Sequence, residues 1–183
     1  MSRLRKTKIT EMARLDVAGY AQSDKTPIIV VLDNVRSMNN VGSVFRTADA
    51  FRLESLYLCG ITARPPHPDI HKTALGAEDN VNWRYYSNTS EAVQELLEAG
   101  YIVYALEQAS GSTSLPDFRP EVGTRYALVL GNEVHGVAQE VIDLASHCLE
   151  IPQYGTKHSL NVSVAAGIAL WQMCAPLLSQ HER

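Results

Sequence analysis

The sequence predicts an α/β fold of three layers, in which helices cover both faces of a largely parallel β-sheet. Short apolar runs rich in β-branched residues recur along the chain, and amphipathic helical patterns separate them. Continuous apolar runs are typical of strands buried on both faces, and strand–helix alternation is typical of parallel sheets. The six expected strands span residues 28–32, 55–58, 81–86, 101–106, 126–130 and 148–151.

Helices are expected between these strands. Val41, Val44, Phe45 and Ala48 recur at positions i, i+3, i+4 and i+7, which form one apolar face of a helix that begins near residue 39 or 40. Segment 87–100 starts with polar capping residues and ends at a glycine. The last helix, about residues 160–178, is apolar on nearly every side. Another surface must therefore cover it, and we expect a homodimer.

Length and composition indicate one domain of 27–183 after a basic arm and helix of 1–26. The 183 residues are 45% hydrophobic and 20% charged, which is typical of a globular protein. The sequence shows neither a membrane-spanning run nor a signal-peptide core, so we expect a cytoplasmic protein without membrane contact. Cys59, Cys148 and Cys174 lack disulfide or zinc spacing and are expected to pack as small apolar side chains.

The charge distribution contains evidence both against and for nucleic-acid binding. A net charge of −4 argues against polyanion binding, because nucleic-acid-binding proteins usually carry a basic surface. However, Arg3, Arg5, Lys6, Lys8 and Arg14 are concentrated in the first segment. Such a run is either a solvated chain end or a nucleic-acid contact, and composition leaves both open.

The first of three unusual polar segments, DNVRSMNNVGSVFRTADAF, spans residues 33–51 after the first strand. Asn40 could cap the following helix, Gly42 could permit close packing, and Arg46 could pair with Asp49 at i+3. Yet Arg46 adjoins the apolar face near the end of a strand. An arginine in that place can hold a phosphate through two hydrogen bonds.

The second segment, LVLGNEVHGV at residues 128–137, is a strand followed by a glycine-rich turn. Gly131 and Gly136 could supply unusual dihedral angles, and Gly131 could let a ligand lie against bare backbone. Glu133 could orient a substrate group or cap a helix, and His135 is expected to be structural. The chain lacks the GxxxxGK[ST] and GxGxxG patterns, which disfavours a phosphate loop and a nicotinamide-type dinucleotide site.

The third segment, IPQYGTKHSLNVSVAAGIAL, spans residues 151–170 and leads into the last helix. Ser159 and Asn161 are each ordinary helix-capping residues. They flank Leu160, and a planar apolar ligand could lie between Ile151 and Leu160 while backbone groups bind its edges.

In this order and spacing, NNVGSVFRTADA, LVLGNEVHGV and IPQYGTKHSLNVSVAAGIAL resemble the three motifs of the SpoU/TrmH branch of the SPOUT methyltransferases. The resemblance covers roughly residues 27–176. It implies a homodimeric enzyme that transfers a methyl group from S-adenosylmethionine to a ribose 2′-hydroxyl of RNA. It also implies a C-terminal trefoil knot, which pattern reasoning does not predict because knots are rare exceptions to the rules of chain topology.

The resemblance also assigns roles to residues. The family's catalytic arginine and its supporting asparagine correspond to Arg46 and Asn40, and the other matched motif residues are Glu133, Ser159 and Asn161. The family's cofactor pocket corresponds to Leu106, Gly131, Ile151 and Leu160. No metal cluster is visible in the sequence, and methyl transfer does not require one.

Chemistry limits what Arg46 can do. An arginine keeps its proton at neutral pH, with a pKa above about 12, so it is a poor base in water. We therefore expect Arg46 to bind the phosphate beside the target ribose and to polarise the hydroxyl. Whether Arg46 also accepts the proton stays open.

The substrate is less specified than the reaction. We expect tRNA rather than rRNA, because the chain shows a basic arm in place of a large recognition domain. A non-catalytic RNA-binding protein of the same fold is the other alternative. The segment of residues 61–79 is expected to be a loop. Its cationic side chains, Arg64, His67, His71 and Lys72, could contact phosphates, and an ordinary surface-exposed loop is the equal alternative.

Overall fold

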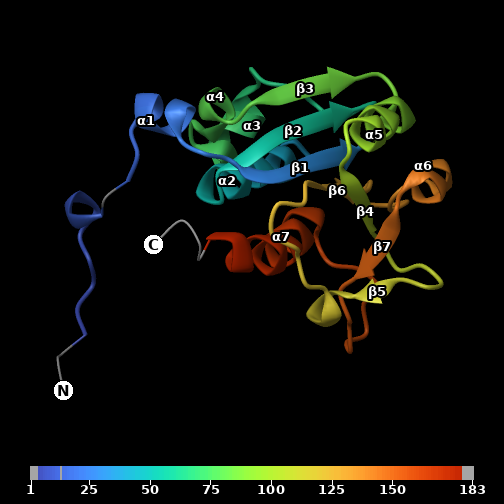
Figure 1. The fold of residues 1–183 in the computed structure, drawn as a ribbon. Helices are drawn as coiled ribbons and strands as arrows, with labels where there is room; N and C mark the ends of the chain where they lie inside the picture. Colours follow the sequence, from blue (N-terminus) through green and yellow to red (C-terminus); the bar gives the residue numbers. More distant parts are fainter. Residues whose placement is uncertain (1–3, 13, 179–183) are drawn as a thin grey trace.

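A computed structural model describes residues 4–12 and 14–178, and within them the chain forms a seven-stranded sheet (Figure 1). Every strand pairing found there is parallel. The spatial order is β3-β2-β1-β6-β4-β7-β5. The strands are β1 (Thr26–Asp33), β2 (Leu53–Cys59), β3 (Trp83–Tyr86), β4 (Ile102–Leu106), β5 (Thr113–Ser114), β6 (Tyr126–Leu130) and β7 (His147–Glu150).

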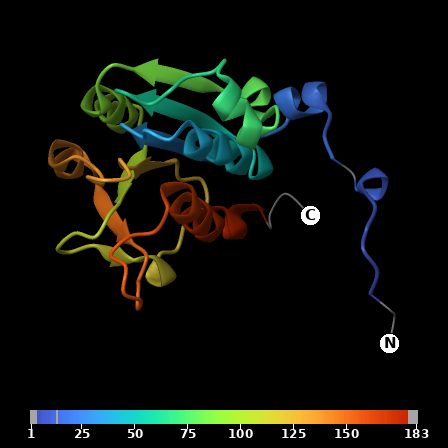
Figure 2. The same cartoon turned by 180° about the vertical axis from the view of Figure 1, so that it is seen from behind.

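The helices cover both faces of the sheet, which confirms the predicted three layers. Residues of α2, α3, α4 and α7 pack on one face, and residues of α5 and α6 pack on the other. Figure 2 shows α2 and α7 side by side. The helices are α1 (Val17–Gln22), α2 (Met38–Ala50), α3 (Pro68–Ala74), α4 (Ala77–Asn80), α5 (Thr89–Glu98), α6 (Gln139–Leu144) and α7 (Val162–Leu178), with 3-10 turns η1 (Ile9–Glu11) and η2 (Leu115–Asp117).

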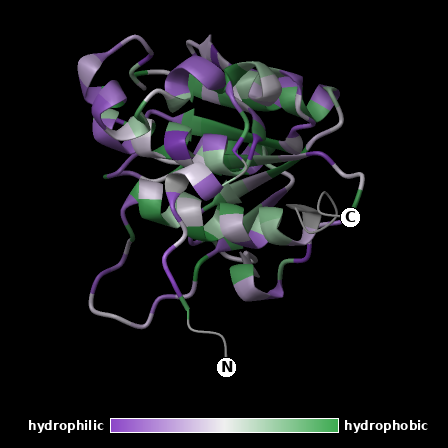
Figure 3. Cartoon of the chain, turned by 90° about the vertical axis from the view of Figure 1, so that its left-hand side faces the viewer, coloured by the Kyte–Doolittle hydropathy of each residue, from purple (hydrophilic) through white to green (hydrophobic). Residues whose placement is uncertain are grey.

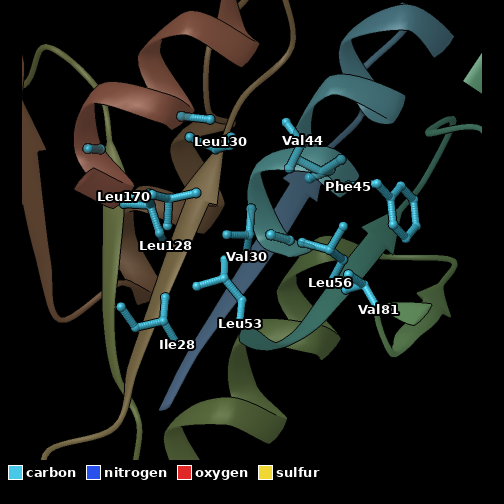
Figure 4. Packing of buried hydrophobic residues seen from close by; sticks show 14 of the residues in the cluster. Ile28, Val30, Val44, Phe45, Leu53, Leu56, Val81, Leu128, Leu130 and Leu170 are labelled. Atoms are coloured by element: carbon cyan, nitrogen blue, oxygen red, sulfur yellow. The ribbon is translucent and has the colours of Figure 1, made fainter. Parts of the chain in front are cut away.

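Strand β1 lies in the middle of the hydrophobic core. Ile28 and Val30 (Figure 4), together with Leu32, pack toward α2 and α7. Ile29 and Val31 pack toward α5 and α6. Burying each such side chain contributes about 1.5–3 kcal/mol, so a strand buried on both faces stabilises the whole sheet. In Figure 3 the strands are largely green, while the helices around them carry purple residues as well.

Helix α2 has the predicted buried face but begins earlier than expected. The four apolar side chains of the predicted stripe are fully buried. Ser37, not Asn40, caps the helix, because its hydroxyl accepts a hydrogen bond from the Asn40 N–H. Gly42 permits a close crossing with α3: a Cβ at this position would lie 2.2 Å from the Ile70 carbonyl oxygen and from the Thr73 hydroxyl.

The prediction of a surface loop over residues 61–79 was wrong, because this segment contains α3 and α4. His67 caps α3 by accepting a hydrogen bond from Asp69 N–H. His71 contacts Glu78 at 2.6 Å, and Lys72 pairs with Asp69 at 2.6 Å. These three side chains therefore stabilise local structure.

Helix α7 is buried on one side and exposed on the other. Ala166, Ala169, Leu170 and Met173 are fully buried. Three apolar side chains on its other side are 51%, 42% and 60% exposed, namely Val164, Ile168 and Trp171. Among the described residues, no helix is long and apolar enough to cross a membrane.

The remaining sequence predictions concern the cysteines and the arm. Cys59 and Cys174 are buried as expected, whereas Cys148 is only partly buried. Within the described residues, no group of three or more metal-ligating side chains occurs. Residues 4–12 of the arm extend away from the sheet (Figure 1), and Arg5 pairs with Glu11 there, whereas Tyr20 of α1 is buried in the core. Arg3 lies outside the described residues.

Candidate active site

A cavity of about 530 Å³ opens at the carboxyl ends of β4, β6 and β7. Because these strands are parallel neighbours, the segments that follow them meet at one edge of the sheet. All four residues predicted to contact a cofactor line this cavity, namely Leu106, Gly131, Ile151 and Leu160. Its volume lies within the range of about 300–1,000 Å³ that is usual for small-molecule sites.

Glu107 and Gln108 connect different walls of this cavity through hydrogen bonds. The Glu107 carboxylate accepts hydrogen bonds from Val137 N–H at 3.0 Å and from Gln108 N–H at 2.8 Å. The Gln108 side-chain amide donates to the His158 carbonyl at 2.9 Å. Sequence reasoning missed both residues. Their one signal was their position directly after Leu106, at the end of an apolar strand.

The turn after β6 folds tightly against itself. The backbones of Asn132 and Gly136 exchange two hydrogen bonds of 2.9 Å, and Gly136 has a φ of +70°. A Cβ on Gly131 would lie 2.1 Å from the Gly136 carbonyl carbon and 2.2 Å from the Val137 nitrogen. Gly131 lines the cavity as predicted, but the bare side of its Cα is filled by the chain itself.

Glu133 connects this turn to the start of α2. Its carboxylate accepts hydrogen bonds from the N–H groups of Arg36 and Ser37, both at 2.9 Å, and from the Asn40 side-chain amide at 3.0 Å. Burial raises the pKa of Glu133, but these donors outweigh it and hold the pKa below its ordinary value. Glu133 therefore stays ionised and binds the backbone directly before α2, where Ser37 is the capping residue.

Asn40 links Glu133 to α7. Its side-chain oxygen accepts a hydrogen bond from the Asn161 amide at 3.1 Å, and Asn161 caps α7 by accepting from the Ser163 and Val164 N–H groups. Glu133, Asn40 and Asn161, each from a different predicted motif, thus form one continuous hydrogen-bonded chain. This chain fixes the three segments relative to one another.

Ser159 and Arg46 are not part of this hydrogen-bonded network. Ser159 is exposed and lines the cavity. Arg46 is exposed on α2 and is absent from the cavity wall, and its side chain makes no hydrogen bond or ion pair with any described residue. The expected Arg46–Asp49 ion pair does not form. The guanidinium of Arg46 is therefore available to a ligand or to a second chain.

The chain is similar to known RNA methyltransferases. The model of the SpoU rRNA Methylase family matches residues 27–171. A tRNA (guanosine(18)-2'-O)-methyltransferase of Thermus thermophilus is 31% identical over 164 residues, which cover 89% of this chain and 82% of that protein. An uncharacterized tRNA/rRNA methyltransferase of Synechocystis is 31% identical over 86% of this chain, but the chain spans only 41% of that relative.

A crystal structure of an AdoMet-bound rRNA methyltransferase from Sinorhizobium meliloti is also similar. It superposes with a TM-score of 0.75 at 30% sequence identity, over 81% of this chain and 56% of that chain. The observed fold thus agrees with that of an S-adenosylmethionine-binding protein.

Proposed function

The chain belongs to the SpoU rRNA methylase family, and from this we propose that it transfers a methyl group from S-adenosylmethionine to a ribose 2′-hydroxyl of RNA. One observation carries the proposal: the segments that follow β4, β6 and β7, the last two being predicted motif segments, converge on one cavity, whose wall contains every residue predicted to contact the cofactor.

The lining of the cavity fits this cofactor. Leu106, Ile151 and Leu160 offer apolar contacts to a planar adenine, and the turn of residues 131–136 offers backbone groups to polar edges. When bound, S-adenosylmethionine supplies an electrophilic methyl group. The hydrogen-bonded chain from Glu133 to Asn161 holds the walls in place, and the Ser159 hydroxyl is free to contact substrate or cofactor.

Arg46 is the residue proposed to act on the RNA. Its permanent charge and free N–H groups suit a phosphate beside the target ribose, where it would also polarise the 2′-hydroxyl. Holding the ribose oxygen in line with the methyl group lowers the barrier by several kcal/mol. Arg46 does not line the cavity of its own chain. This position is consistent with a dimer in which Arg46 of one copy completes the active site of the other.

We further propose that the protein is a homodimer whose α7 faces cover one another, since this helix exposes Val164, Ile168 and Trp171. Residues 27–183 would form the catalytic domain, with a C-terminal trefoil knot, and residues 1–26 an RNA-binding arm. The expected compartment is the cytoplasm.

Transfer RNA is the favoured substrate class. The relative named for tRNA guanosine 18 matches 89% of this chain at 31% identity, and the rRNA methyltransferase structure matches 81% at 30%. Ribosomal RNA is therefore the second candidate.

Substitution of Arg46 tests this proposal. Arg46→Ala should lower the rate of methyl transfer to tRNA about 10²- to 10³-fold, because a positioned charge is lost from the transition state. Cofactor affinity, measured by calorimetry, and the unfolding temperature should stay unchanged. Arg84→Ala, which removes the same charge from the edge strand β3, serves as the control and should keep normal turnover.

Two results would contradict the proposal. Near-normal turnover of Arg46→Ala would remove this residue from the mechanism. Failure of the wild-type protein to bind S-adenosylmethionine would favour a non-catalytic RNA-binding protein instead.

A further inference from the structure

A second cavity, of about 520 Å³, lies at the carboxyl ends of β2 and β3, between the segment of residues 60–65 and the side chains of Trp83 and Tyr85. We call it the edge groove, because β3 is the first strand of the sheet. Trp83 and Tyr85 alternate with Arg84 along β3 and therefore face the same side of the sheet.

An arginine stacks on an exposed aromatic ring in this groove. The guanidinium carbon of Arg64 lies 4.1 Å from the centroid of the Tyr85 ring. Tyr85 is 39% exposed, and its hydroxyl donates a hydrogen bond to the Gly60 carbonyl at 3.1 Å. The hydroxyl bond fixes the ring, so the stacked pair is a preformed platform rather than a loose surface contact.

The charge of Arg64 is not neutralised within the described part of the chain. No described carboxylate pairs with it, and residues 60–67 contain no acidic side chain. Two other arginines differ, since Arg84 pairs with Glu95 at 2.7 Å and Arg125 with Glu54 at 3.0 Å. A stacked arginine with free N–H groups suits a phosphate or the face of a base.

Hydrogen bonds hold the edge groove at a fixed position relative to the candidate active site. The Ile61 N–H donates to the Asn34 side chain at 3.1 Å, and the Val35 N–H donates to the Thr62 hydroxyl at 2.9 Å. Asn34 and Val35 belong to the segment after β1 whose next residue, Arg36, donates its N–H to Glu133. The edge groove and the candidate active site thus both lie at the carboxyl ends of the strands, and residues 34–36 connect them.

We propose that the edge groove binds an unpaired nucleotide of the RNA substrate, separate from the nucleotide that is methylated. The base would stack on the Arg64–Tyr85 pair, with Ile61 as an apolar rim that is 66% exposed, and the guanidinium would bind the adjacent phosphate. A base in a duplex does not offer its face for stacking, so the groove selects single-stranded RNA. This inference rests on the proposed function.

Binding of labelled RNA tests the groove. The probes are a fluorescent 20-nucleotide single strand of mixed sequence and the duplex of the same sequence. Arg64→Ala and Tyr85→Ala should each weaken single-strand binding roughly tenfold, because stacking is lost. Only Arg64→Ala should also reduce the slope of log affinity against log salt, by about 0.7, since one phosphate contact is removed.

Control variants separate this role from a structural one. Arg84→Ala removes the same charge from β3 and should bind the single strand like wild type. Tyr85→Phe keeps the ring and should retain most of the affinity. Duplex binding and cofactor affinity should be the same for Arg64→Ala, Tyr85→Ala and wild type.

Single-strand binding by Arg64→Ala and Tyr85→Ala equal to that of wild type would overturn the inference, as would an equal loss for single strand and duplex. Both results leave the proposed function standing if the wild-type protein binds cofactor and methylates RNA. Absence of cofactor binding by the wild-type protein contradicts the proposed function itself.

Discussion

Glu133 combines three roles in one side chain. It joins the turn after β6 to the start of α2, it holds Asn40, and through Asn40 it reaches Asn161. Its partners lie 93 to 97 positions away in the sequence. No local pattern reveals such partners, which is why the sequence predicted the residue but left its role open between a substrate contact and a helix cap.

The carboxylate of Glu133 should make folding stability depend on pH. Its pKa in the folded chain lies below the ordinary value of 4.5. The stabilisation is therefore complete above pH 4.5 and is lost as the pH falls through the lower folded-state pKa. Wild type should be more stable than Glu133→Gln at pH 7, and urea unfolding at decreasing pH should show this difference shrinking below about pH 4.5.

An exposed carboxylate on α6 provides the control. Glu140→Gln should leave stability and its pH dependence unchanged, because the Glu140 carboxylate is exposed and accepts no hydrogen bond from any described residue. A Glu133→Gln variant with the same stability as wild type at pH 7 would mean that the bonds to Arg36, Ser37 and Asn40 contribute nothing to folding.

At the scale of the element, the turn after β6 depends on the absence of a side chain at Gly131. Gly131→Ala should lower the free energy of unfolding by about 1–3 kcal/mol, because the new Cβ would overlap the Gly136–Val137 backbone, which has no room to move. Denaturant unfolding measures this. Gly155→Ala, in the segment before α7, is the matched control, since its Cβ would meet no atom within 4 Å.

Unchanged stability of Gly131→Ala would show that the turn adapts easily. The cavity wall would then be less fixed than its hydrogen bonds indicate.

The elements differ in how far the sequence predicts them. β1 and β6 are long apolar runs buried on both faces, and the sequence locates them within two residues. β5 has only two residues and α4 only four, too short for any periodicity to develop. α3 begins at a proline in a segment rich in loop-forming residues, so its composition suggested a loop.

The residues of the candidate active site also differ in how far the sequence predicts them. Leu106, Ile151 and Leu160 were located from strand ends and from the family resemblance, and the cavity contains them. The contribution of Glu107 was not predictable, because its partner Val137 belongs to a different loop, 30 residues away. The edge groove depends likewise on a contact between Arg64, in the segment after β2, and Tyr85 on β3.

At the scale of the whole molecule, the exposed face of α7 predicts self-association. We expect the protein to sediment as a dimer at micromolar concentration, because Val164, Ile168 and Trp171 form a stripe of exposed apolar side chains on this helix. Ile168→Glu should shift the protein to a monomer by placing a charge in the interface. Sedimentation velocity distinguishes the two states.

Val122 is 68% exposed outside α7, so Val122→Glu should remain a dimer and serves as the control. A wild-type protein that is monomeric at micromolar concentration would contradict the covered-helix explanation. It would also leave Arg46 without a second cavity to complete.

The most direct test of the whole account follows the methyl group itself. The full-length protein is incubated with methyl-labelled S-adenosylmethionine and unmodified tRNA transcripts, and the RNA is digested to nucleosides and separated. We expect the label in a 2′-O-methylated nucleoside, in an amount that falls sharply with Arg46→Ala. Label on a base, or none in tRNA or in rRNA offered in its place, would contradict ribose methylation by this protein.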